Sequence, residues 1–168
     1  MSRTFPAALA TVLRSEKIQP VWLCHISTGG SPADLRFSAY DGDISFASQT
    51  WSRRPFDAPE ISAEDHNDAP TRELRIADAD GYFQTLLAGG ITFGSRRVRL
   101  YLTDLTLVGT GSALTDAIVS HFIIEGFTRV HGWAVLRLRS LLSVFEIDLP
   151  LTTVTHSEFP GLVDSGAA

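Results

Sequence analysis

The sequence is poor in cysteine, in long apolar runs and in net positive charge. Cys24 is the one cysteine among 168 residues, so an intramolecular disulfide and a cysteine-based zinc site are both excluded. We interpret Cys24, inside the apolar run VWLCHIS, as a buried structural thiol. Charged residues or glycines interrupt every apolar stretch before the roughly 18 residues of a membrane-spanning helix, so no such span is expected.

The net charge of −5 argues against a general nucleic-acid binder, because contacts to phosphates need a basic face. With 44% hydrophobic and 20% charged residues, the composition is typical of a soluble globular domain. The first 17 residues have the spacing of an amphipathic helix and no convincing cleavage site, so we do not interpret them as a signal peptide.

Apolar residues at every second position predict strands over much of the chain. The pattern is clearest in residues 20–28, 35–40, 44–48, 72–78, 96–107 and 118–150. Helical spacing occurs in residues 5–17 and 79–90, each ended by proline or glycine. Many short strands separated by turn signals predict a mainly β (α+β) fold, an antiparallel β-barrel with an N-terminal helix and one short internal helix.

The same pattern predicts how the chain is divided. Residues 1–18 are expected to form an N-terminal helix or arm, residues 19–150 the barrel domain, and residues 151–168 a C-terminal extension that is partly extended or disordered. We expect Asp78–Gly81, DADG in the sequence, to be a cap and turn before the internal helix.

No motif for catalysis or metal binding is present. The histidines lack the short spacing of a metal site, no Gly-x-Ser-x-Gly elbow occurs, and GTGSAL lacks the lysine of a phosphate loop. The expectation is therefore a protein that is not an enzyme and has no cofactor and no metal. Two alternatives remain: a cell-wall hydrolase using Asp43, Glu64 or His66, and a small-ligand β-barrel binder.

The order of the pieces resembles a known family. An N-terminal helix is followed by VWLCHIST, an Asp-Gly hairpin, ISFASQTWSRRPFDAPEIS, RELRIADADGYFQTLLAGG and RRVRLYLTDL. This order is similar to the N-terminal domain of the lambda-type minor tail protein L group, found at the tail tips of long-tailed phages, and to short homologues in phages and gene transfer agents. The similarity covers about the first two thirds of the chain.

The resemblance implies a tail-hub-domain-like barrel at the virion tail tip, synthesised in the bacterial host cytoplasm. There it would form a ring of three or six copies between the distal tail protein and the central hub or fibre protein. Members of the lambda-type group carry a cysteine-rich segment linked to an iron–sulfur cluster. This chain has only Cys24, so no cluster is expected.

The resemblance, the acidic loop and the strand and helix patterns together assign residues to the core and to interfaces. Trp51 and Phe56 would close one end of the barrel, and Arg53 and Arg54 would point outward. The core set is Trp22, Trp51, Phe56, Leu74, Ile76 and Phe83. The interface set is Arg53, Arg54, Glu60, Glu64, Asp65, Arg97, Arg99, Arg137 and Arg139.

Overall fold

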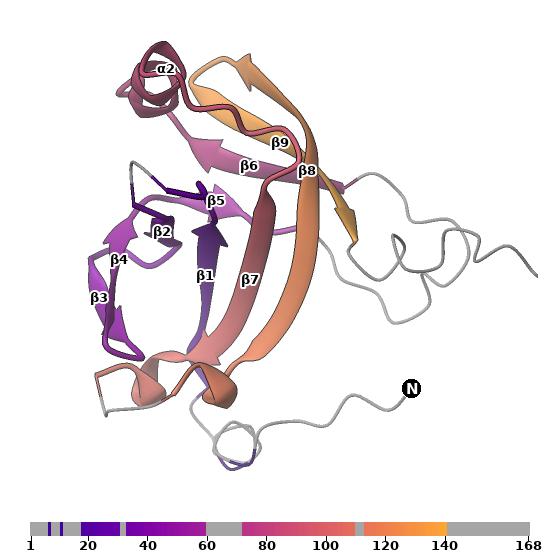
Figure 1. The fold of residues 1–168 in the computed structure, drawn as a ribbon. Coiled ribbons are helices and arrows are strands. Elements are labelled where there is room, and N and C mark those ends of the chain that lie inside the picture. Colours follow the sequence, from indigo (N-terminus) through magenta and orange to yellow (C-terminus); the bar gives the residue numbers. More distant parts are fainter. Residues whose placement is uncertain are drawn as a thin grey trace, which may run out of the picture.

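The computed structural model describes residues 7, 11, 18–30, 33–59, 72–109 and 113–140. Nine strands, one α-helix and two 3₁₀ helices have described bounds (Figure 1). The elements are β1 (Pro20–Ile26), β2 (Leu35–Ser38), β3 (Ile44–Phe46), β4 (Gln49–Arg53), β5 (Phe56–Asp57), β6 (Arg72–Ala77), α2 (Tyr82–Ala88), β7 (Arg97–Asp104), η1 (Leu105–Leu107), η2 (Leu114–Asp116), β8 (Ile118–Val130) and β9 (Trp133–Ser140). The fold is therefore mainly β, as the alternating pattern predicts.

The strands form one mixed sheet with the order β3-β4-β2-β1-β7-β8-β9-β6-β5. All pairs are antiparallel except β2 and β4, which run parallel. The predicted all-antiparallel arrangement is therefore wrong at this point, because β4 lies between β3 and β2 and runs parallel to β2. This placement brings Trp51, the one buried side chain of β4, against Tyr101 of β7, with ring centroids 5.6 Å apart.

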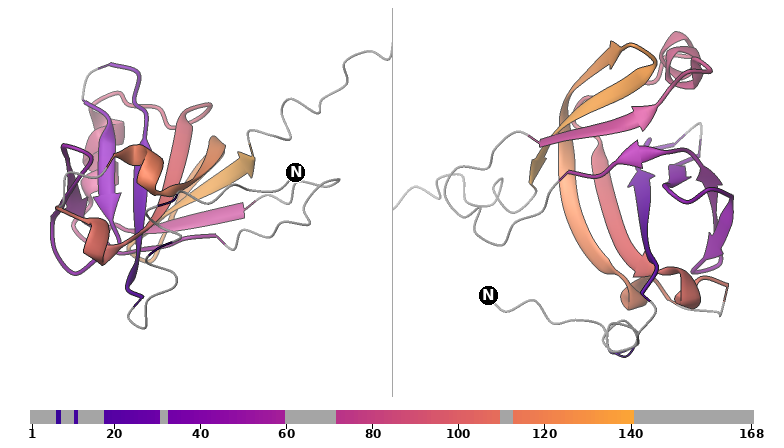
Figure 2. Two further views of the ribbon diagram at one scale, coloured as in Figure 1. Left: turned by 90° about the horizontal axis from the view of Figure 1, so that it is seen from below. Right: turned by 180° about the vertical axis from the view of Figure 1, so that it is seen from behind.

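The sheet is strongly curled but is not closed into the predicted barrel (Figures 1 and 2). Its order has two ends, β3 and β5, and no ladder joins them among the described strands. The chain itself crosses between the two flanks, because β4 runs through Arg54 and Pro55 into β5. Arg54 N–H donates to Ser38 O at 3.0 Å, and Ala77 N–H donates to Pro55 O at 2.9 Å. Pro55 has no N–H and cannot donate to a strand ladder. The covalent chain itself therefore connects the two flanks of the sheet at this point.

The inner face of the sheet carries the larger apolar cluster. Alternate residues of β1, β6, β7, β8 and β9 point into it, as the period of two requires. Its fully buried members include Ile26, Leu74, Ile76, Val98, Leu100, Ile124, Leu136 and Leu138. At the edge of this cluster, Phe83 of α2 is 0% exposed and its ring lies 5.8 Å from Phe37 and 5.5 Å from Phe93. The helix α2 thus packs on one end of the curled sheet (Figure 1).

A β-bulge in β8 extends this cluster. The register of β8 against β9 shifts between Ile124 and Gly126, leaving Glu125 as the extra residue. Before the bulge the even-numbered residues face inward, and after it Phe127 faces inward opposite Leu136. The Phe127 ring stacks at 5.2 Å from Phe93. Without the extra residue, every side chain after Ile124 would change faces.

A second apolar cluster lies on the other face of β1 and β7. Val21, Leu23 and Tyr101 are buried there under the β3–β4 hairpin, which contributes Ile44, Phe46 and Trp51. The hairpin turns through Ala47 and Ser48, with φ of 53° and 58°, and Trp51 Nε1 donates to Phe46 O at 3.2 Å. Because β1 and β7 are covered on both faces here, the outer face of these two strands is apolar under the hairpin.

The structure also places the predicted core residues. Trp51 is 1%, Phe56 7%, and Leu74, Ile76 and Phe83 are each 0% exposed, while Trp22 is partly buried against the larger cluster. Of the predicted divisions, nearly all of residues 1–18 and all of residues 151–168 lie outside the described residues. Among the helices of the described part, none has the length and apolar character to span a membrane.

We expect Trp51→Ala to lower the free energy of unfolding by about 3–5 kcal/mol, because it empties the site between β1, β7 and the hairpin. Trp51→Phe should cost less, since it keeps a ring against Tyr101 and loses the hydrogen bond to Phe46 O. Chemical denaturation of the purified chain measures both. A loss below about 1 kcal/mol for Trp51→Ala would contradict the packing role.

Candidate interaction surface

The described residues offer little for catalysis. They contain no group of three or more His, Cys, Asp or Glu side chains placed to hold a metal ion. Burial raises the pKa of the Cys24 thiol far above its ordinary value, which removes it as a nucleophile. Asp43, one of the three residues of the hydrolase alternative, accepts a hydrogen bond from Arg53 N–H at 2.6 Å. The other two, Glu64 and His66, lie outside the described residues.

The predicted interface residues fall into three groups. Glu60, Glu64 and Asp65 lie outside the described residues. Arg53 and Arg54 each have a carboxylate partner within the chain, Asp41 and Asp80 respectively. The remaining four are Arg97 and Arg99 on β7 and Arg137 and Arg139 on β9.

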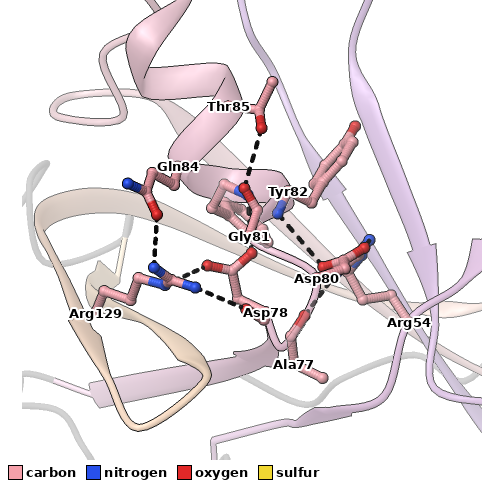
Figure 3. A network of polar contacts seen from close by, with 10 residues as sticks. Arg54, Ala77, Asp78, Asp80, Gly81, Tyr82, Gln84, Thr85 and Arg129 are labelled. Carbon is pink, nitrogen blue, oxygen red and sulfur yellow. Dashed lines mark hydrogen bonds and ion pairs between the residues drawn. The ribbon is translucent and has the colours of Figure 1, made fainter.

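Arg54 holds the turn between β6 and α2 (Figure 3). Its Nη1 donates to Ala77 O at 2.8 Å and to Asp80 Oδ1 at 2.9 Å, while Nη2 donates to Asp80 Oδ2 at 2.8 Å. The guanidinium carbon lies 4.6 Å from the centroid of the Tyr82 ring. Such a bidentate, stacked arrangement needs the planar fork of arginine. Arg54 therefore joins the crossing segment to the start of α2, and its side chain is only 16% exposed.

Arg129 holds the same turn from the end of β8 (Figure 3). Its Nε lies 2.8 Å from Oδ2 of Asp78, a side chain with 0% exposure, and its Nη1 donates to Gln84 Oε1 at 2.7 Å. Asp78 Oδ1 accepts from Phe83 N–H at 2.9 Å, which satisfies one of the free amides at the helix start. Gly81, the N-cap, has no side chain to do this. The DADG pattern indicated Asp78 as part of a cap and turn, but nothing in the sequence pattern indicated its partner Arg129.

A row of arginine and histidine side chains crosses four strands on the outer face of the sheet. Register places Arg36 of β2 opposite His25 of β1, His25 opposite Arg99 of β7, and Arg99 opposite His121 of β8. Residues directly opposite share a face, so these four side chains lie side by side. The row lies next to the second apolar cluster. The His25 and Trp51 rings meet edge to face, with their centroids 6.5 Å apart.

Three more arginines extend this row along β7 and β9. Arg97 and Arg139 are both opposite Ile123 of β8, and Arg137 lies two residues from Arg139 on the same face. Arg97, Arg137 and Arg139 are exposed. We call the set of Arg36, His25, Arg97, Arg99, His121, Arg137 and Arg139 the cationic face. Sequence periodicity indicated the arginine pairs on β7 and β9, but not Arg36, His25 or His121.

Two carboxylates already bind on this face. Asp34 Oδ2 lies 3.0 Å from His25 Nε2, and Asp34 Oδ1 accepts from Thr28 N–H at 3.0 Å. Glu125, the extra residue of the bulge, lies 3.2 Å from Arg139 Nε. The pKa of the Asp34 carboxyl is lowered, because hydrogen bonds from Thr28 and His25 and the charge of Arg36 together outweigh its burial. The face therefore favours carboxylates in the ionised form.

The two histidines of the face are held in the neutral form. Burial and the nearby Arg36 and Arg99 lower the pKa of His25, although Asp34 acts in the opposite direction. Burial, Arg99 and Arg97 lower the pKa of His121. At neutral pH the charge of the face thus comes from its arginines.

Comparison with known proteins supports the fold. No protein-family model matches the chain, and no curated protein matches it in sequence. Among solved structures, a chain of the virion of a native gene transfer agent particle matches with a TM-score of 0.56 and 14% identity. The match covers 85% of this chain and 47% of that chain, so this protein spans about half the length of the neighbour. At this identity the match shows a shared fold.

Arg54 and Asp80 give a first testable prediction for this surface. Arg54→Ala should lower the free energy of unfolding by about 2 kcal/mol, because it removes charge-assisted hydrogen bonds to Asp80 and Ala77. Arg54→Lys keeps the charge without the fork and should recover only part of this. Asp80→Asn should cost less than about 1 kcal/mol, because the Asp80 side chain is largely exposed and its ion pair is screened.

The same pair has a pH signature. Arg54 lowers the pKa of the Asp80 carboxyl from 3.8 to about 2. A carboxyl with a depressed folded-state pKa stabilises above its unfolded pKa, so this contribution is complete above pH 3.8 and is lost as the pH falls toward 2. Urea unfolding at a series of pH values should show this loss in the wild type. An equally steep loss in Arg54→Ala would contradict the pairing.

The histidines give a second prediction. Arg99→Gln should raise the pKa of both His25 and His121, because Arg99 lowers both. Arg53→Gln removes the same charge on β4 and should move neither. NMR titration of the imidazole C–H signals measures these values. The pKa values of both histidines in the folded state lie below 6.5, the value in the unfolded chain. Their neutral form therefore contributes fully to the free energy of unfolding above pH 6.5. As the pH falls below 6.5 the free energy of unfolding decreases, and this decrease should be less steep in Arg99→Gln.

Proposed function

We propose that this protein is a structural component of the tail tip or baseplate of a bacteriophage or phage-like particle. There it forms a ring that connects the distal tail to the central hub or fibre. The observation that carries the proposal is the shared fold with a chain of a gene transfer agent virion, which extends over 85% of this protein. The order of sequence motifs independently resembles the tail-tip proteins of the lambda-type group.

The character of the surface and core supports an assembly role. The larger apolar cluster fills the inside of the curled sheet with fully buried side chains such as Leu74, Ile124 and Leu138, which disfavours a hollow ligand barrel. The exposed arginines of the cationic face lie in regular rows on the sheet, and such a surface suits a charged partner. A protein of this kind works through contacts between subunits.

The proposed partners are other copies of the chain, in a ring of three or six, and the neighbouring tail proteins on each side of the ring. These are a distal tail protein and a hub or fibre protein. In this arrangement the interface residues are Arg97, Arg99, Arg137 and Arg139 on the sheet, and Glu60, Glu64 and Asp65 in the acidic segment between β5 and β6. The protein is synthesised in the host cytoplasm and is found at the virion tail tip.

The test is the place and copy number of the protein in purified particles. We expect imaging of labelled particles to locate it at the distal end of the tail, in a multiple of three copies. Deleting its gene should stop assembly before the tail tip is complete, and supplying the protein in trans should restore it. Particles that assemble fully without the protein, or that carry it along the whole tail, would overturn the proposal.

A further inference from the structure

Two arginines of β7 have no carboxylate partner. Among the described residues, the side chains of Arg97 and Arg99 form neither an ion pair nor a hydrogen bond, whereas Arg54 and Arg139 each bind a carboxylate. Arg97 and Arg99 lie two residues apart on the outer face of one strand, so about 6.6 Å separates their Cα atoms. Like charges at this spacing repel one another, and a bound anion would relieve the repulsion.

The neighbouring strand β8 adds two side chains at the same place. Register puts His121 opposite Arg99 and Ile123 opposite Arg97, and β7 and β8 run side by side over this length (Figure 1). Side chains directly opposite on one face are the closest neighbours in a sheet. His121 is exposed and Ile123 is half-buried, so a partner can reach both. We call these four residues, Arg97, Arg99, His121 and Ile123, the β7–β8 patch.

Carboxylates of this chain already occupy the strands on either side of the patch. Towards β2, Asp34 Oδ2 lies 3.0 Å from His25 Nε2, and Asp34 Oδ1 accepts from Thr28 N–H at 3.0 Å. Towards β9, Glu125 Oε1 lies 3.2 Å from Arg139 Nε. The patch lies between these two occupied positions, and its own two arginines are the ones left without a carboxylate.

An acidic peptide segment fits the patch better than a nucleic acid. In an extended segment, side chains at alternate positions lie about 6.8 Å apart, which matches the spacing of Arg97 and Arg99. Each guanidinium can bind one carboxylate through two parallel hydrogen bonds. Ile123 adds apolar surface that the carbon atoms of a side chain can cover. A nucleic acid needs a longer series of phosphate contacts than two arginines supply.

We propose that the β7–β8 patch binds an extended acidic segment of a neighbouring protein, with carboxylates at alternate positions on Arg97 and Arg99. His121 lies beside the carboxylate on Arg99 and can donate an imidazole N–H to it. The proposal rests on the proposed function only for the presence of a neighbouring protein. The partner is defined by its chemistry, two ionised carboxylates with one residue between them.

NMR titration of the full chain with a short blocked peptide tests this contact. The peptide has glutamate at three alternate positions and serine between them, and a thymidine tetranucleotide supplies the same number of charges as phosphates. We expect the peptide to shift the amide signals of Arg99 and His121. Arg97→Gln/Arg99→Gln should raise the Kd of the peptide about tenfold or more. The matched control Arg53→Gln/Arg75→Gln removes two exposed arginines elsewhere and should leave the Kd unchanged.

The imidazole of His121 gives a second readout in the same titration. Burial, Arg99 and Arg97 lower its pKa in the free protein. A carboxylate bound beside it favours the protonated form, so the peptide should raise the pKa of His121. By linkage, the affinity for the peptide should rise as the pH falls below 6.5. The glutamine version of the peptide should cause no such shift.

Three results would overturn the contact. The first is a peptide that moves neither the amide signals of the patch nor the pKa of His121. The second is a control, Arg53→Gln/Arg75→Gln, that weakens binding as much as Arg97→Gln/Arg99→Gln. The third is a tetranucleotide that binds the patch more tightly than the peptide. Thermal unfolding of both variants checks that each is folded during these measurements.

Particle assembly separates this contact from the proposed function. If Arg97→Gln/Arg99→Gln takes its place at the tail tip as the wild type does, the patch has no partner there and the proposed function stands. If peptide binding depends on Arg97 and Arg99 but the wild-type protein is absent from particles, the contact stands and the proposed function fails.

Discussion

The structure depends on one constraint, the passage of a single stretch of chain between the two flanks of the sheet. Residues 49–57 run as β4 beside β2, cross at Arg54 and Pro55, and continue as β5 beside β6. A flat sheet in the observed order would hold β4 and β5 far apart, so the sheet must curl until its flanks are adjacent. The curl in turn creates an inside, where the larger cluster is buried, and an outside.

The crossing also explains the polar network at the start of α2. Arg54 lies at the crossing itself and reaches the β6–α2 turn, and Arg129 reaches the same turn from β8. Burying Asp78 would be costly if it were alone, but Phe83 N–H and Arg129 compensate its charge. The helix is short and gains little stability by itself. Its position over the end of the sheet therefore depends on these two arginines and on Phe83.

The outer surface is divided by the same geometry. Where the β3–β4 hairpin folds back, β1 and β7 are buried on both faces and Trp51 packs on Tyr101. Beyond the hairpin the same strand faces carry His25, Arg99 and Arg97. The apolar part of this outer surface packs against the β3–β4 hairpin and holds it in place. The cationic face, beyond the hairpin, remains available for partners. This division fits a protein whose work is done by contact surfaces, which is the basis of the function that we propose.

The sequence by itself determined the local features of this protein. Alternation at Val98 and Leu100, at Leu74 and Ile76, and at Leu136 and Leu138 is enough to predict strands with one buried face, and DADG is enough to predict the turn before α2. Only the tertiary structure decided which strands are neighbours. The parallel pairing of β2 with β4, the bulge at Glu125, the left-handed turn at Ala47 and Ser48, and the partners of Arg54 and Arg129 all depend on it. The row from Arg36 to His121 depends on it too. The reason is physical: a period of two specifies which residues share a face, but register and strand order follow from contacts between residues far apart in the chain.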